Sequence, residues 1–126
     1  MRDGFTPLEG LGPHLDAVGP VHARGDVLGL LIEERHLNPA GTAHGGLLAT
    51  LVDSALGHAI RDEMDEGRPA TVSLTTDFLG AVQEGDWVEA RAEVERLGGS
   101  LAFADCSLRV GEREVVRARA VFAVLD

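Results

Sequence analysis

The stretch from Asn38 to Asp53 holds the densest set of polar residues in this sequence that could do chemistry. Asn38 is followed by His44, Gly45 and Gly46, and Asp53 lies further along the same segment. Glycines at the start of a helix leave unpaired N–H groups open to close approach, which suits a site that stabilises an oxyanion. A nearby carboxylate could act as a general base toward water or as a nucleophile toward an acyl carbon. Together these residues favour acyl transfer.

Each of these residues also has a plainer interpretation. Gly45 and Gly46 would destabilise a helix by about 1 kcal/mol each relative to alanine, and they could merely allow close packing of the loop. A single histidine such as His44 is more often structural than catalytic, and a mid-helix carboxylate such as Asp53 usually faces solvent. Asn38 alone fits an ordinary turn. The residues by themselves leave both interpretations open.

Composition and motifs exclude several other classes of function. The sequence has no G-x-S-x-G elbow and no H-E-x-x-H motif. Cys106 is the only cysteine, which excludes an internal disulfide and a cysteine-based zinc site, and its context predicts an inert strand residue. The net charge of −10 argues against a nucleic-acid partner. Because the sequence shows neither a signal-peptide pattern nor a membrane-length apolar run, we expect a cytoplasmic protein without a membrane partner.

One long helix is predicted from Leu47 to Ile60, because apolar residues recur there at helical spacing and form a single stripe. Asp53 lies off this stripe. Its neighbours one turn away, Ala49 and Gly57, are small, so another chain could approach this face closely.

Extended segments are predicted on both sides of the helix, and the last four are joined by short connections. Such connections predict that these four strands pair in chain order as an antiparallel meander. The sheet would bury the helix most simply by wrapping around it, as one α+β domain over residues 1–126. The predicted strands are Leu15 to Ala23, Val27 to Glu34, Thr71 to Leu79, one around Val88 to Val94, Leu101 to Val110, and Val115 to Leu125.

The edges of such a sheet would be exposed. Pairing with a second copy would satisfy an edge strand and would bury the small-residue face around Asp53. We therefore expect a homodimer.

The pattern Asn38-x2-Gly41-x2-His44-Gly45-Gly46, followed by Asp53, resembles the signature of hotdog-fold acyl-CoA thioesterases of the phenylacetate-pathway (PaaI-like) type. The likeness covers nearly the whole chain. It implies an antiparallel sheet wrapped around one central helix. It also implies hydrolysis of acyl-CoA to free acid and coenzyme A, with no cofactor or metal beyond the coenzyme A of the substrate. The implied assembly is a homo-oligomer, a dimer of hotdogs that we expect to form a homotetramer.

The resemblance also implies roles for individual residues. The Gly45 N–H would polarise the thioester carbonyl, and Asp53 of the facing subunit would be the base or the nucleophile. Asn38 and His44 would position the thioester or the water.

In some relatives a hydroxyl on the strand after the helix holds the water. Ser73 aligns with that position, but the alignment slips by two residues there, so Thr71 or Thr75 could take its place. Many relatives carry Arg-Pro shortly after this hydroxyl, where the present sequence has Gly80 and Ala81. Any contact made by that arginine is therefore missing from this position.

Two other functions are compatible with these residues. Asp53 and His58 are spaced as in some hotdog enoyl-CoA hydratases and dehydratases, although in those relatives the pair lies in a loop rather than in a helix. A non-catalytic acyl-CoA-binding protein is the second alternative. Retention of Asn38, His44, Gly45 and Asp53 together weighs against it.

Overall fold

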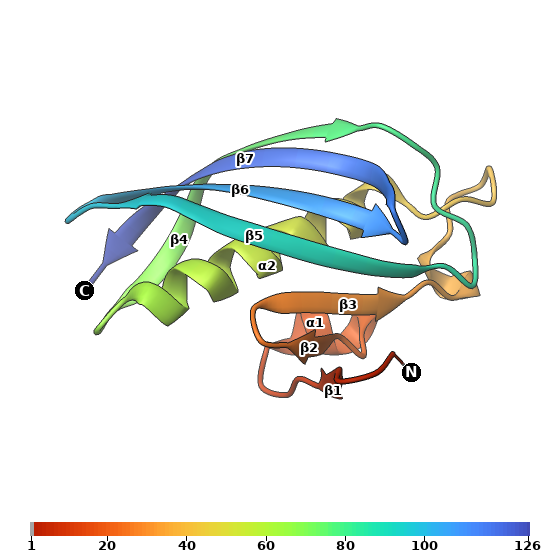
Figure 1. Cartoon of the computed structure of the whole chain (residues 1–126), viewed down its shortest axis with the longest axis horizontal. Coiled ribbons are helices and arrows are strands. Elements are labelled where there is room, and N and C mark those ends of the chain that lie inside the picture. The colour runs from red at the N-terminus through yellow and green to blue at the C-terminus, as the bar shows by residue number, and fades with distance from the viewer. Residues whose placement is uncertain (1) are drawn as a thin grey trace.

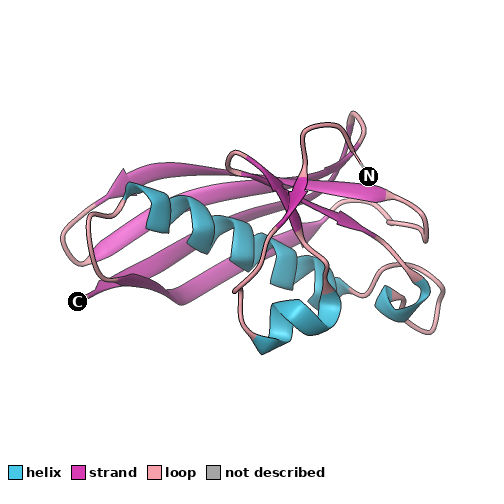
Figure 2. Ribbon diagram, turned by 90° about the horizontal axis from the view of Figure 1, so that it is seen from below, coloured by secondary structure: helices cyan, strands magenta, loops and turns pink. Residues whose placement is uncertain are grey.

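The computed structural model describes residues 2–126 and shows one long helix lying across the concave face of a seven-stranded antiparallel sheet (Figure 1, Figure 2). This is the predicted architecture. The helices are α1 (Pro13–Val18), the 3₁₀ turn η1 (Glu34–His36) and α2 (Gly45–Glu63). The strands are β1 (Thr6–Pro7), β2 (His22–Arg24), β3 (Val27–Leu31), β4 (Arg68–Phe78), β5 (Trp87–Leu97), β6 (Leu101–Val110) and β7 (Arg113–Leu125).

The apolar stripe of α2 is buried against the sheet, as its spacing predicts. The stripe joins one core cluster with inward-facing residues of the strands, among them Val88, Ala104 and Phe122. Burial along the whole helix fixes its position on the sheet. The buried residues of α2 are Leu47, Leu48, Leu51, Val52, Ala55, Leu56, Ala59 and Ile60.

None of the helices in the described chain is long and apolar enough to cross a membrane.

The prediction of a strand over Leu15 to Ala23 is wrong. The structure has a helix, α1, at Pro13–Val18, and β2 covers only His22–Arg24. Proline in the first turn favours a helix because its φ is already set and its missing N–H is not needed there. In this segment the proline at the start therefore favours a helix, although the spacing of the apolar residues predicts a strand.

The last four strands do not all pair in chain order, which corrects the predicted meander. β5, β6 and β7 form a meander, but β4 pairs with β7, and β5 pairs with β3. The connection over residues 79–86 is not a tight turn, and it carries the chain across the end of the sheet (Figure 1). β4 consequently forms an edge of the sheet, and one of its sides has no strand partner within residues 2–126.

A β-bulge in β4 changes the face on which each of its side chains lies. Thr71 is opposite Phe122, Ser73 is opposite Val121, and the register shifts between the two pairs. Phe122 is buried beneath the helix, so Thr71 lies on the helix side of the sheet and Ser73 on the outer side. Val72, which lies between these two residues at the bulge, is 61% exposed.

Candidate active site

The side chain of His44 caps the N-terminus of α2. Its Nδ1 accepts a hydrogen bond from the Gly46 N–H at 2.9 Å. A backbone N–H can only donate, so in the neutral ring Nδ1 carries no proton and Nε2 does. Because the His44 side chain is exposed, its Nε2–H is accessible to a ligand.

The first four N–H groups of α2 are those of residues 45–48. Among them, only the N–H of Gly45 has no acceptor within residues 2–126. The Gly46 N–H donates to the His44 ring. The N–H groups of Leu47 and Leu48 donate to the His44 carbonyl at 3.0 and 3.1 Å. The N-terminus of a helix carries partial positive charge, so the Gly45 N–H is well suited to an oxyanion.

The structure separates the two interpretations of the glycine pair. A Cβ on Gly46 would lie 3.1 Å from Nδ1 of His44, tighter than a normal contact, so the capping position of the His44 ring favours glycine there. A Cβ on Gly45 would lie 3.5 Å from the ring of Phe78, which is an ordinary contact distance. Packing therefore accounts for Gly46 but not for Gly45, where access to the N–H is the better explanation.

Asn38 organises the loop that leads into α2. Its Oδ1 accepts hydrogen bonds from the N–H groups of Ala40 and Thr42 at 3.0 and 3.2 Å, and its Nδ2 donates to Oγ1 of Thr42 at 3.2 Å. An isolated bridge between Leu37 and Ala43 closes the base of the loop. In this structure Asn38 shapes the helix entrance.

Asp53 lies in the middle of α2 and is half-buried against β4. Its Oδ1 accepts a hydrogen bond from Oγ1 of Thr71 at 2.6 Å. The bulge makes this contact possible, because it turns Thr71 toward the helix. Ser73 and Thr75 lie on the outer face of β4. Of the three candidate hydroxyls, the structure thus brings that of Thr71 to the carboxylate.

Asp53 and the Gly45 N–H do not meet within one chain. They are separated by eight residues of helix, a rise of about 12 Å. A general base must lie within about 3 Å of the proton that it abstracts, or act through one water. If both groups act on one thioester, Asp53 must therefore come from a second subunit.

The edge of the sheet beside Asp53 is open and apolar. Val72, Phe78 and Leu79 are 61%, 53% and 56% exposed, and all three lie on β4 or directly after it. An unpaired strand edge that carries apolar side chains is a surface suited to another chain. Phe78 also brings this edge next to Gly45.

A family model described as "Thioesterase superfamily" matches residues 40–117, which include Gly45, Asp53 and Thr71. The chain belongs to the thioesterase superfamily. A Pseudomonas aeruginosa protein named "Putative esterase PA0474" is 44% identical over 97% of this chain and 96% of its own length. Acyl-coenzyme A thioesterase 13 of Mus musculus is 36% identical over 61% of this chain and 55% of that protein.

The fold of this thioesterase matches that of solved structures. The PaaI protein of the E. coli phenylacetic acid degradation operon superposes with a TM-score of 0.75, at 24% identity, over 79% of this chain and 72% of that one. This superposition confirms the predicted hotdog fold, and the family match confirms membership of the thioesterase superfamily.

An arginine approaches Gly80 and Ala81, the two residues that stand where the resemblance implies Arg-Pro. Nη1 of Arg113, at the start of β7, donates to the Ala81 carbonyl at 2.8 Å. A Cβ on Gly80 would lie 3.1 Å from the same nitrogen, so glycine leaves room for the guanidinium. The sequence alone could not reveal this contact, because the two segments are far apart along the chain.

His58 is directed away from Asp53 in this thioesterase. Five helical residues turn about 140°, and Nε2 of His58 lies 3.8 Å from Oδ2 of Asp62. Within residues 2–126, Asp26, His58 and Asp62 form the one group that could share a metal ion, with ligand atoms within 4.8 Å of one another. The neighbouring Asp62 carboxyl raises the pKa of Asp26. This group lies on a different side of α2 from Asp53.

Cys106 faces the core on β6. Burial raises the pKa of its thiol to about 12, so the thiol stays protonated and is a poor nucleophile near neutral pH. This agrees with the predicted inert strand residue.

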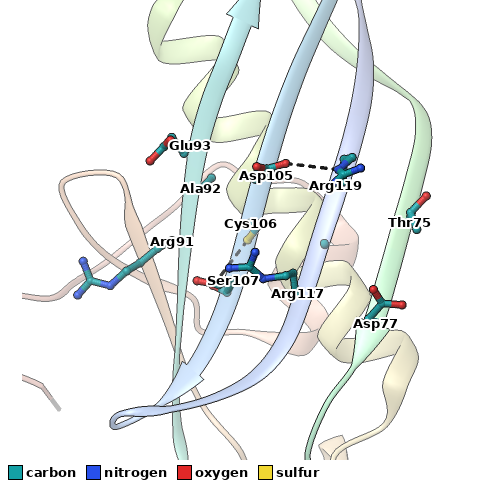
Figure 3. Close-up of a pocket in the computed structure, with 11 residues that line it drawn as sticks. Thr75, Asp77, Arg91, Ala92, Glu93, Asp105, Cys106, Ser107, Arg117 and Arg119 are labelled. Carbon is teal, nitrogen blue, oxygen red and sulfur yellow. Dashed lines mark hydrogen bonds and ion pairs between the residues drawn. The ribbon is translucent and has the colours of Figure 1, made fainter.

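A shallow hollow of about 470 Å³ lies on the outer face of the sheet (Figure 3). It is lined mainly by charged and polar side chains from β4 to β7, and Nε of Arg119 lies 3.9 Å from Oδ1 of Asp105. The sheet separates this hollow from Asp53 and Gly45. It is therefore distinct from the candidate active site.

Proposed function

We propose that this thioesterase hydrolyses acyl-CoA to free acid and coenzyme A at a site shared by two subunits. The observation that carries the proposal is the N–H of Gly45 at the start of α2, which has no acceptor within residues 2–126 and follows directly on the exposed ring of His44. Two donors at a helix N-terminus are suited to the oxygen of a thioester as it gains negative charge. The name of the murine relative, an acyl-coenzyme A thioesterase, supports acyl-CoA as the substrate.

In the proposed reaction Asp53 of the second subunit activates water. Its Oδ2 takes a proton as the water oxygen attacks the thioester carbonyl carbon. The resulting oxyanion is stabilised by the Gly45 N–H, and its collapse breaks the C–S bond. The departing thiolate takes up the proton, which leaves free acid and coenzyme A. Direct attack by Asp53 would instead form an anhydride. Attack of ¹⁸O-water on the aspartyl carbonyl of that anhydride in a single turnover would leave label in the Asp53 carboxylate, whereas the general-base reaction labels only the released acid.

We infer that the second subunit docks along the open edge of β4. The exposed Val72, Phe78 and Leu79 supply an apolar contact there, and Asp53 lies beside the same edge. We further propose that two such dimers pack through the outer face of the sheet to form a tetramer. Leu101 and Phe103 are exposed on that face. A dimeric mass in light scattering would exclude the tetramer.

The proposed activity is tested by thiol release from short, medium, long and aryl acyl-CoAs. Turnover of at least one class, lost in Asp53→Asn, is the expected result. Tight binding of acyl-CoA without thiol release over hours would instead indicate the non-catalytic binding protein. Hydration of crotonyl-CoA without thiol release would indicate the hydratase.

The bulge in β4 predicts different effects for two neighbouring hydroxyls. Thr71→Val removes the hydrogen bond to Oδ1 of Asp53 while keeping the shape of the side chain, and we expect kcat to fall about 10-fold. Ser73→Ala, on the outer face, is expected to leave kcat within about 2-fold of wild type. Steady-state thiol release measures both. A larger loss for Ser73→Ala would contradict the role of Thr71.

Mixed dimers test whether the site is shared. Gly45→Pro removes the oxyanion donor and Asp53→Asn removes the base, so each homodimer should be nearly inactive. Random reassortment of the two chains produces mixed dimers in which one site is intact and the other lacks both groups. About a quarter of wild-type activity should then return. Verified mixed dimers without any recovery would show that each site is built from one chain.

A further inference from the structure

His36 is a buried histidine near the helix entrance, and the proposed reaction does not use it. It is 3% exposed. Its Nδ1 accepts a hydrogen bond from the Glu33 N–H at 2.9 Å, and its Nε2 lies 2.6 Å from the Val18 carbonyl. Because Nδ1 must be the acceptor, the proton of the neutral ring is on Nε2, which donates to Val18. Both ring nitrogens are therefore occupied by backbone partners.

The main chain of His36 is bonded to the residue that caps α2. Its carbonyl accepts a hydrogen bond from the His44 N–H at 2.8 Å. Two hydrogen bonds between His36 and Glu33 close the 3₁₀ turn η1. The Glu33 N–H donates to the His36 ring, and the His36 N–H donates to the Glu33 carbonyl. The ring thus sets the shape of the turn whose carbonyl holds His44. Its bond to Val18 ties that turn to α1.

The position of His44 determines the geometry of the entrance. Its ring caps Gly46, and its carbonyl accepts the N–H groups of Leu47 and Leu48. These bonds leave the Gly45 N–H as the group without an acceptor in the described part of the chain. A shift of His44 would therefore move both proposed donors to the substrate, its own Nε2–H and the Gly45 N–H.

We propose that His36 is a positioning residue of the active site, which acts by fixing the main chain of His44 through the hydrogen bond from the His44 N–H to the His36 carbonyl. The consequence for the rate rests on the proposed function. The structural consequence does not, because it concerns the ring of His44 in the resting protein.

The test uses His36→Phe together with two variants that each keep one bond. Phenylalanine fills the space but makes neither ring bond, and we expect kcat to fall about 10- to 100-fold with KM within about 3-fold. Oδ1 of asparagine can take the place of Nδ1 and accept from Glu33. His36→Asn should therefore recover kcat to within about 5-fold of wild type, and His36→Gln, which suits the Val18 bond instead, should recover less.

The matched control is His22→Phe. His22 is another buried histidine, 7% exposed, on β2, and its ring packs against Trp87 rather than against the helix entrance. We expect this variant to lower the melting temperature, as His36→Phe does, while kcat stays within about 3-fold of wild type. An equal loss of kcat in both variants would make the effect of His36 one of general stability and would overturn the inference.

A second readout is independent of turnover. The imidazole ¹⁵N chemical shifts of His44 report whether its Nδ1 still accepts a hydrogen bond. They should change in His36→Phe and remain as in wild type in His22→Phe. Unchanged His44 shifts and unchanged kcat in His36→Phe would overturn the positioning role. A changed His44 ring in a protein that releases no thiol from any acyl-CoA would contradict the proposed function alone.

Discussion

Asp53→Asn is expected to lower kcat by roughly 10²- to 10⁴-fold, the contribution of a positioned general base. Asparagine has nearly the same shape, and its Oδ1 can still accept the hydrogen bond that Thr71 donates at 2.6 Å. The amide cannot take a proton from water, so the loss should fall on kcat while the fold and the dimer persist. Thiol release, a thermal melt and light scattering measure the three quantities.

The matched control for this variant is Asp62→Asn. Asp62 is a carboxylate on the same helix, about 180° around it from Asp53, where it pairs with His58. The substitution Asp62→Asn should leave kcat within about 2-fold of wild type. Wild-type turnover in Asp53→Asn would remove Asp53 from the mechanism.

Gly45→Pro is expected to lower kcat by about 10²- to 10³-fold without destabilising the protein. Proline replaces the N–H that would bind the oxyanion, and loss of one such donor has an effect of about this size. Gly45 is the first residue of α2, where proline is favoured, and His44 has ψ of 133°, which suits a residue before proline. Stability should remain or rise by about 0.4–1 kcal/mol, as a thermal or urea melt would show.

Gly45→Ala is the control that separates loss of the donor from loss of access. It keeps the N–H and adds only a Cβ at 3.5 Å from the Phe78 ring. Alanine should stabilise the helix, by up to about 1 kcal/mol, and should lower kcat less than proline does. Equal kcat in Gly45→Pro and wild type would exclude this N–H as the oxyanion donor. A large loss of stability in Gly45→Ala would restore the packing explanation for the glycine.

The sequence by itself determined the central helix and the candidate residues around its start. The stripe from Leu47 to Ile60 has a helical period that no strand could bury on one face, so burial of α2 follows from local spacing alone. The same holds for β6, whose predicted and observed bounds agree. The His44-Gly45-Gly46 entrance and Asp53 carry the family resemblance in their residue types and spacing.

Local spacing also has limits, which the N-terminal segment shows. Only a few residues distinguish a strand from a helix over Leu15 to Ala23. Pro13, at the start of α1, favours the helix that the structure shows. Residues 79–86 read as one more short connection, although they carry the chain across the sheet. Partner choice between strands depends on contacts far apart in sequence, which spacing does not encode.

Only the tertiary structure decided which groups of the site meet. Thr71 and Ser73 look equivalent in an alternating strand, yet the bulge between them places one on the helix side and the other on the outer side. The two glycines also look equivalent in the sequence. In the structure the His44 ring packs against Gly46, while the N–H of Gly45 has no acceptor among the described residues. The physical reason is the same in both cases: residue type sets which chemistry is possible, while long-range register and packing set which atoms come within bonding distance.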